Sequence, residues 1–251
     1  MESMQNRTVN FQDLGEQQDY KKTWDLQESM LQEIVELKMK RRKLERDLPE
    51  NPELQKEIDS IVTPNHLLFV EHPHVYTLGK SGDEHNMLAN DEKLKEINAT
   101  YVKTNRGGDI TYHGPQQLVG YPILDLDNFK TDIHWYLRCL EEVIIKTIAN
   151  YGIKGERSPG ETGVWLDVGR PFARKICAMG VKASRWVTMH GFALNVNADL
   201  RYFEYIIPCG IQDKAVTSLE RELDRKIQMS EVKALVKQHF AEVFEADIIE
   251  S

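Results

Sequence analysis

The stretch RYFEYIIPCGI, residues 201–211, places a thiol, Cys209, directly after an apolar run. Such a thiol can be core filler, a metal ligand or a nucleophile, and free cysteine is among the most buried residue types. Pro208 and Gly210 on either side favour a loop beyond the end of the run, and loops often carry functional side chains. The local sequence therefore predicts a loop thiol and leaves its role open.

The stretch TNRGGDITYHGPQQLVGYPI, residues 104–123, offers a second candidate site. Its adjacent glycines, Gly107 and Gly108, let a ligand approach the main chain closely. One interpretation is a binding loop that presents amides and the Arg106 guanidinium to a substrate. The other is a tight hairpin turn in which His113 is only a satisfied polar residue, and composition alone favours it because Gly-Gly turns are common. The phosphate-loop pattern GxxxxGK[ST] is missing, so nucleotide binding is not indicated.

Two further patterns carry ionisable side chains. Residues 174–197 alternate apolar residues with Lys175 and Lys182, and a lysine beside a buried strand is usually an edge or snorkelling residue. The EHPH stretch sets His72 and His74 two apart, but Pro73 spoils a regular strand, and no HExxH or CxxC accompanies them. Local evidence therefore disfavours catalysis by either lysine, and we expect no metal site.

Composition limits the class of protein. With 251 residues, of which 41% are hydrophobic, the chain can bury one large core, and we expect a single domain over residues 1–251. A formal charge of -8 argues against a general nucleic-acid binder. Three widely spaced cysteines fit a reduced, cytoplasmic protein, and no apolar stretch is long enough for a membrane span. We expect a monomer, because the predicted helices show no exposed apolar stripe.

The elements that would position these side chains can be read from periodicity. Helical spacing predicts amphipathic helices over residues 24–48, 131–152 and 230–246, with Ser230 as the cap of the last. We expect the basic run at 38–46 to be a solvated helix end and the charged, proline-containing segment at about 47–65 to be a surface insertion. Strand-like runs follow, at 66–79, 99–104, 109–114, 117–126, 163–168, 174–184 and 187–197. This order predicts an α+β fold, a mixed β-sheet layered with helices.

The motifs occur in a familiar order. Together, LLFVEHPHVYTLGKSG, RGGDITYHGPQQLVGYPILDL, GVW, RKICAMGVKASRWVTMHGFALNVNADL, IIPCGI and VTSLERELD resemble the lipoyl(octanoyl) transferase family, also called lipoate-protein ligase B. The resemblance covers residues 10 to 245 or so. It implies the biotin/lipoate protein ligase fold and transfer of an octanoyl group, without ATP, metal or other cofactor. The implied donor is the phosphopantetheine of acyl carrier protein. The implied acceptor is a lysine on lipoyl domains of 2-oxoacid dehydrogenase complexes or on the glycine cleavage H protein.

The resemblance also implies a site. Cys209 matches the family's acyl-thioester cysteine, and Lys175 matches the lysine that works beside it, so Lys182 is not the catalytic choice. The substrate-binding stretches fall on Arg106, Gly107, Gly108, Asp109, Ile110, Thr111, Tyr112, His113, Ala178, Met179, Gly180, Gly191, Phe192 and Ala193. We expect an apolar acyl slot lined by Ile110, Tyr112, Met179, Phe192 and Leu194. For the acidic carrier protein we expect positive charge from Arg106, Arg170, Arg174 and Arg185.

The sequence departs from the family pattern in two places, and two other functions are alternatives to octanoyl transfer. The segment at about 47–65 is longer than the family leads us to expect, and Gln116 stands where a glycine is usual, which we expect to reshape the pocket rim. An ATP-dependent lipoate ligase of the same fold would need a lysine but no thiol, so IIPCG argues against it. A non-catalytic acyl- or lipoyl-domain-binding module would not need both Cys209 and Lys175.

Overall fold

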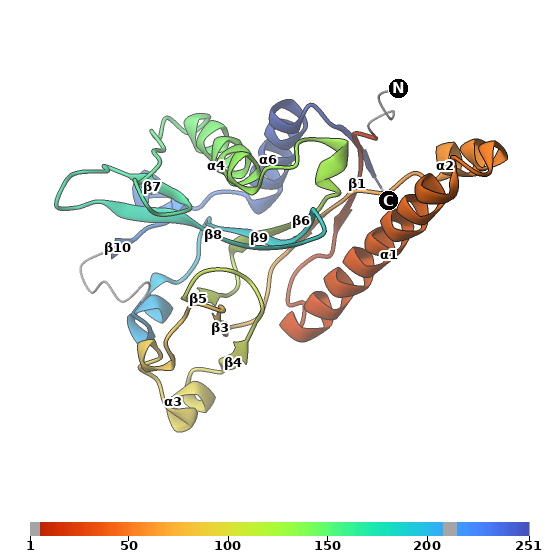
Figure 1. Ribbon diagram of the computed structural model, residues 1–251. Coiled ribbons are helices and arrows are strands. Elements are labelled where there is room, and N and C mark those ends of the chain that lie inside the picture. Colours follow the sequence, from red (N-terminus) through yellow and green to blue (C-terminus); the bar gives the residue numbers. More distant parts are fainter. Residues whose placement is uncertain (1–5, 208–214, 251) are drawn as a thin grey trace.

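The computed structural model describes residues 6–207 and 215–250 and contains two β-sheets (Figure 1). In spatial order, the large sheet consists of β10 (Ala215–Val216), β8 (Arg174–Ser184), β9 (Val187–Asn195), β6 (Gln117–Ile123), β2 (His66–Val70), β1 (Thr8–Asp13) and β11 (Asp247–Glu250), with β7 (Val164–Leu166) paired to β8. Neighbours from β8 to β2 are antiparallel, whereas β1 is parallel to both β2 and β11. The sheet is therefore mixed, as predicted.

A small sheet of β4 (Thr100–Lys103), β3 (Val75–Leu78) and β5 (Ile110–His113) lies below the large one in Figure 1. The strand run predicted over 66–79 is in fact two strands, because the chain leaves β2 after Val70 and enters β3 of the other sheet at Val75. The EHPH segment is therefore the crossing between the sheets. Strands β1, β10 and β11 were not predicted.

Helices cover both faces of the large sheet (Figure 1). α4 (Ile133–Ala149) and α6 (Met229–Phe244) pack on one face and α1 (Tyr20–Asp47) on the other, so the apolar residues form a separate cluster on each side. Shorter helices are α2 (Gln55–Ser60), α3 (Asp91–Glu96), α5 (Leu219–Leu223) and the 3-10 helices η1 (Pro52–Leu54), η2 (Glu84–Asn86), η3 (Leu126–Asn128) and η4 (Leu200–Tyr205). Within residues 6–207 and 215–250, no helix has the length and apolar character needed to cross a membrane.

The three predicted helices are confirmed, with termini that differ by one to four residues; the largest difference is in α1, which begins at Tyr20 rather than at residue 24. The Asp132 side chain caps α4 by accepting from the amide of Trp135. α6 begins at Met229, ahead of the predicted cap Ser230, and its N-cap residue Gln228 makes no side-chain capping bond. Packing of Val232, Val236 and other apolar residues, rather than a cap, holds this helix in place.

We had expected the basic end of α1 to be solvated, but part of it is buried. Lys38 is buried and forms ion pairs with Asp125 and, at 2.8 Å, with Asp127. Asp125 also accepts from the Thr63 hydroxyl at 2.8 Å, which ties the segment after α2 to the same group. The rest of the predicted insertion forms η1 and α2, which lie alongside the end of α1.

Replacing Lys38 with alanine should destabilise the fold by about 3–5 kcal/mol, because it leaves the buried Asp125 carboxylate without its counter-charge. The matched control is Lys40→Ala, two residues on, which removes only an exposed pair with Glu57 and should change stability by less than about 1 kcal/mol. Urea unfolding of both variants measures the difference. Equal stability of the two variants would show that the buried pair does not matter.

A two-residue turn joins β8 to β9 and sets the register of the site. Arg185 and Trp186 both adopt left-handed backbone conformations, with φ of 50° and 67°, which is typical of tight hairpins. The long ladder that follows pairs Ala178 with Ala193, Met179 with Phe192 and Gly180 with Gly191. Two of the stretches matched by sequence are thereby placed side by side.

Candidate active site

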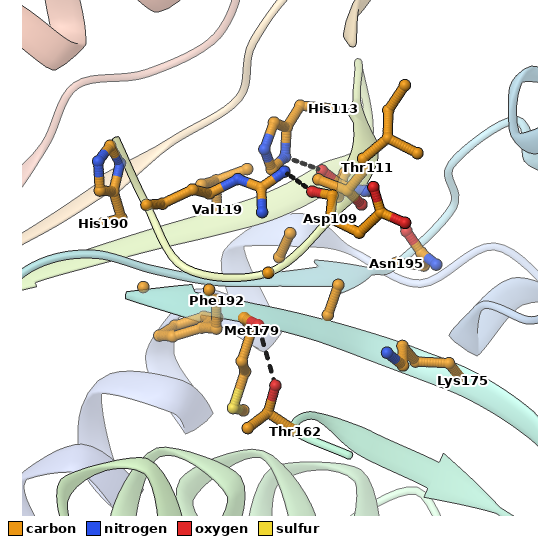
Figure 2. Close-up of a pocket in the computed structure, with 18 of the residues that line it drawn as sticks. Asp109, Thr111, His113, Val119, Thr162, Lys175, Met179, His190, Phe192 and Asn195 are labelled. Atoms are coloured by element: carbon orange, nitrogen blue, oxygen red, sulfur yellow. Dashed lines mark hydrogen bonds between the residues drawn. The ribbon is translucent and has the colours of Figure 1, made fainter. Parts of the chain in front are cut away.

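A cavity of about 350 Å³ lies between the loop that leads into β5 and the strands β8 and β9 (Figure 2). This volume falls within the usual range for small-molecule sites. Most of the predicted site residues line the cavity: Arg106, Gly108, Asp109, Ile110, Thr111, His113, Lys175, Ala178, Met179, Gly180, Gly191, Phe192 and Ala193. Segments that are far apart in the sequence therefore meet in one place.

Three predicted residues lie elsewhere. The amide of Gly107 donates to the carbonyl of Val181 at 2.9 Å, which fastens the loop to β8. Tyr112 is fully buried in the core of the small sheet, where its hydroxyl lies 2.7 Å from Nδ1 of His74. Leu194 is part of the large core cluster beneath α4 and α6, so neither it nor Tyr112 lines the acyl slot as expected. The predicted nucleophile, Cys209, lies outside the described residues.

The lining also contains residues that sequence reasoning missed. They are Tyr20, Gln117, Val119, Tyr121, Gly160, Glu161, Thr162, His190, Asn195, Phe203 and Val216. Gln117, Val119 and Tyr121 alternate along β6, so a period of two could have identified them once β6 was taken as a wall. The contributions from α1, η4 and the loop before β7 are non-local and had no signal in the sequence.

The loop at residues 106–109, with the sequence RGGD, is both a turn and a wall of the cavity. Arg106 is only 7% exposed, and its guanidinium donates to the carbonyls of Thr77 at 2.6 Å, Gly107 at 2.9 Å and Asp109 at 2.7 Å. Gly108 has φ of +85°, a conformation that other residues rarely adopt. Arg106 therefore holds the loop in shape from inside.

Only two of the four arginines expected to offer positive charge to the acidic carrier protein are exposed. Arg106 is buried, and Arg174 pairs with Asp167 at 2.6 Å and with Glu222 at 2.5 Å. Arg170 and Arg185 remain exposed, Arg170 at the loop between β7 and β8 and Arg185 at the hairpin tip.

Hydrogen bonds fix the tautomers of the two histidines that line the cavity. Gln117 donates its amide to Asn195 Oδ1 at 2.9 Å, so its Oε1 accepts from Nδ1 of His113 at 2.8 Å. Asn105 donates to Glu28 at 2.7 Å, so its Oδ1 accepts from Nε2 of His190 at 2.8 Å. Burial lowers the pKa of both histidines to about 3, so both are neutral at pH 7.

The buried histidines should make the fold acid-sensitive below pH 6.5. Burial lowers the pKa of His72 to about 4 and those of His113 and His190 to about 3. The unfolded chain, in which histidine has a pKa of about 6.5, therefore binds more protons between about pH 6.5 and pH 4. Stability is fully present above this window and should fall inside it by up to about 1.4 kcal/mol per histidine and pH unit. Urea unfolding at about pH 7, 6 and 5 measures this loss, and a flat profile would contradict it.

Lys175 stands at one end of the cavity, opposite His190 (Figure 2). Its strand, β8, pairs there with both β7 and β10. Its Nζ lies 4.6 Å from the centroid of the Trp165 ring, within cation–π range. Lys182 instead pairs with Glu28 of α1 at 2.9 Å and is not part of the lining.

Two other sequence features are explained by the structure. His72 and His74 make separate hydrogen bonds, to Tyr121 and Tyr112, and among residues 6–207 and 215–250 no three His, Cys, Asp or Glu side chains gather as a metal site. Gln116 has φ of +64°, in the region that favours glycine, and its Oε1 accepts from Asn197 at 2.8 Å. It does not line the cavity, so the expected change at the pocket rim is not seen.

Relatives of known name cover nearly the whole chain. The lipoyl protein ligase A/B catalytic domain matches residues 19–241. The octanoyltransferase of Christiangramia forsetii is 62% identical over 244 residues, which are 97% of this chain and 98% of that protein. The octanoyltransferase of Flavobacterium johnsoniae is 60% identical over 245 residues, 97% of this chain and 100% of that protein. The predicted resemblance is confirmed.

Solved structures show the same fold at low identity. A bi-partite lipoate protein ligase from Thermoplasma acidophilum matches with a TM-score of 0.60 and 18% identity, over 75% of this chain and 74% of that one. Lipoate-protein ligase A bound with ATP matches with a TM-score of 0.61 and 15% identity, over 75% and 76%. The predicted lipoate protein ligase fold is confirmed, and with the match over residues 19–241 the chain belongs to the lipoyl protein ligase A/B catalytic-domain family.

Proposed function

We propose that the protein transfers an octanoyl group from the phosphopantetheine of acyl carrier protein to a lysine of lipoyl domains, through a thioester on Cys209. The observation that supports this most is the near-full-length similarity to proteins named octanoyltransferase. The cavity supports it as well, because Lys175 stands at one end of a partly apolar chamber.

The chemistry is that of thioester exchange. The Cys209 thiolate attacks the carbonyl of the octanoyl thioester, the bond to the pantetheine sulfur breaks, and that sulfur leaves and takes up a proton. The amine of the acceptor lysine then attacks the new thioester, the bond to Cys209 breaks, and an amide forms while the amine loses a proton. The first step exchanges like for like and the second forms a more stable bond, so ATP is not required.

Lys175 would assist both steps. A thiol has an unperturbed pKa of about 8.5, so it is mostly protonated at neutral pH and needs help to react. An ammonium about 4 Å away favours the thiolate by at most ~4 kcal/mol at an effective dielectric of about 20, before desolvation is subtracted. A neutral lysine could instead take the proton from the thiol or from the incoming amine. In the proposal Lys175 fills one of these roles.

Apolar residues of the lining would bind the acyl tail. Ile110, Val119, Met179, Phe192 and Phe203 line the cavity, and they come from β5, β6, β8, β9 and η4. Burying six methylenes and one methyl at ~0.8 kcal/mol each contributes about 5 kcal/mol, which favours medium-length chains. The same increment discriminates weakly between neighbouring chain lengths.

A transfer assay separates this function from its rivals. The purified protein is mixed with an unmodified lipoyl domain and either octanoyl-acyl carrier protein without ATP or free octanoate with ATP. The proposal predicts that the lipoyl domain gains one octanoyl mass in the first mixture only. Transfer only in the second would indicate an ATP-dependent ligase. Binding to the lipoyl domain with no transfer in either would indicate a binding module.

A further inference from the structure

A buried carboxylate stands behind the cavity wall without being part of it. Glu141 of α4 is completely buried, yet it does not line the cavity. Its Oε2 accepts from Arg138 at 2.6 Å and from Arg157 at 3.1 Å, and its Oε1 accepts from the backbone amide of Gly163 at 3.1 Å. Burying a carboxylate is costly unless it is paired in this way, and an apolar residue would fill the space at less cost. Its partners therefore call for an explanation.

Two of those partners, Arg157 and Gly163, lie in the segment that joins α4 to β7, whereas Arg138 is on α4 itself. Residues 157–163 are closed at the base by paired backbone hydrogen bonds between Glu156 and Trp165, of 2.8 Å and 2.9 Å. Arg157 and Gly163, which bind Glu141, are the first and last residues of this loop. Glu141 therefore holds both ends of the loop against α4.

The middle of the same loop is a wall of the cavity. Gly160, Glu161 and Thr162 line it, and the Thr162 hydroxyl donates to the carbonyl of Met179 at 3.3 Å (Figure 2). The loop crosses the edge of β8 beyond the three residues where β7 pairs with it. A shift of the loop would therefore change the room beside Met179.

The position of Gly163 shows how closely the loop is fitted. Gly163 has φ of +110°, and a Cβ there would lie 2.5 Å from the carbonyl oxygen of Cys177 and 3.6 Å from Cε of Lys175. The amide that Glu141 accepts from thus belongs to a residue in close contact with β8 and with the stem of Lys175.

We propose that Glu141 is a positioning residue that fixes loop 157–163 as a cavity wall and thereby limits the acyl chain length that the cavity accepts. This inference rests on the proposed octanoyl transfer. Glu141→Gln keeps the shape of the side chain but removes the charge that holds both arginines. The loop then moves away from β8 more easily and longer chains fit.

The test compares kcat/KM for octanoyl- and decanoyl-acyl carrier protein in the wild type and three variants. The octanoyl-to-decanoyl ratio should fall severalfold, by up to about 15-fold, in Glu141→Gln, because the burial increment used above for one methylene corresponds to a factor of about 15 for two. Glu142→Gln is the matched control, because it removes a 2.5 Å pair with the same Arg157 without touching Gly163, and its ratio should stay at the wild-type value. Thr162→Val removes the bond to Met179 with no change of charge and should lower the ratio in the same direction.

The outcomes separate positioning from plain stability. Equal loss of activity toward both donors in Glu141→Gln, or a lower melting temperature with an unchanged ratio, would overturn the inference. If Glu141→Gln does not fold, an unchanged ratio in Thr162→Val overturns it. If the wild type transfers neither acyl group, the proposed function fails, and the relative affinity for free octanoate and decanoate in the same variants decides the role of Glu141. In that binding experiment, an octanoate-to-decanoate affinity ratio in Glu141→Gln equal to that of the wild type would overturn the inference.

Discussion

Replacing Lys175 with methionine should lower kcat for octanoyl transfer by about 10²- to 10⁴-fold, the usual contribution of a positioned acid or base. Methionine fills much of the same space beside Trp165 but carries no charge and no proton. Stopped-flow measurement of thiol acylation and a steady-state transfer assay would both show the loss. KM for the donor should change much less, because Lys175 stands at one end of the cavity rather than along its apolar walls.

Lys182→Met is the matched control for that result. Lys182 lies on the same strand, β8, but pairs with Glu28, which keeps hydrogen bonds from Asn105 and Trp24 when the lysine is removed. The activity of Lys182→Met should stay within about threefold of the wild type, because this half-buried pair lies outside the cavity lining. Similar losses in the two variants would show that Lys175 acts only as one of several structural lysines.

Replacing Cys209 with alanine should abolish transfer, a loss of about 10⁴-fold or more, because no other group then carries the acyl chain between donor and acceptor. The other two thiols are the controls. Cys139 and Cys177 are buried in the core, where burial raises the pKa of Cys139 to about 11 and that of Cys177 further, so neither forms a thiolate readily. Cys139→Ala and Cys177→Ala should retain activity once corrected for folded protein. Transfer by Cys209→Ala at the wild-type rate would rule out a thioester intermediate on Cys209.

Local sequence patterns account for much of the fold. The apolar faces of α1, α4 and α6 were predicted because helical periodicity is a local property. β1 and β11 were missed because only Val9 and Phe11 of β1 are buried, and β11 has no fully buried residue. These short strands exist because of parallel pairing, β1 with β2 and β11 with β1, and such long-range contacts leave little trace in a short segment.

The candidate site could be predicted only in part. The motif resemblance brought together β8, β9 and the loop before β5, and the structure places most of those residues in one cavity. Tyr112 was wrongly assigned to the cavity lining, because Ile110, on the same face of β5, does line the cavity, whereas Tyr112 is fully buried in the core of the small sheet. Tyr20, Phe203 and loop 157–163, which Glu141 holds from behind, reach the cavity from distant parts of the chain, and only the three-dimensional structure reveals them.

The most direct test of the proposed mechanism is the intact mass of the protein after mixing with octanoyl-acyl carrier protein alone, with no acceptor present. We expect the wild type to gain the mass of one octanoyl group, the gain to disappear on treatment with hydroxylamine, and Cys209→Ala to gain nothing. An adduct that forms equally on Cys209→Ala, or no adduct on the wild type with a donor of proven integrity, would contradict the thioester mechanism.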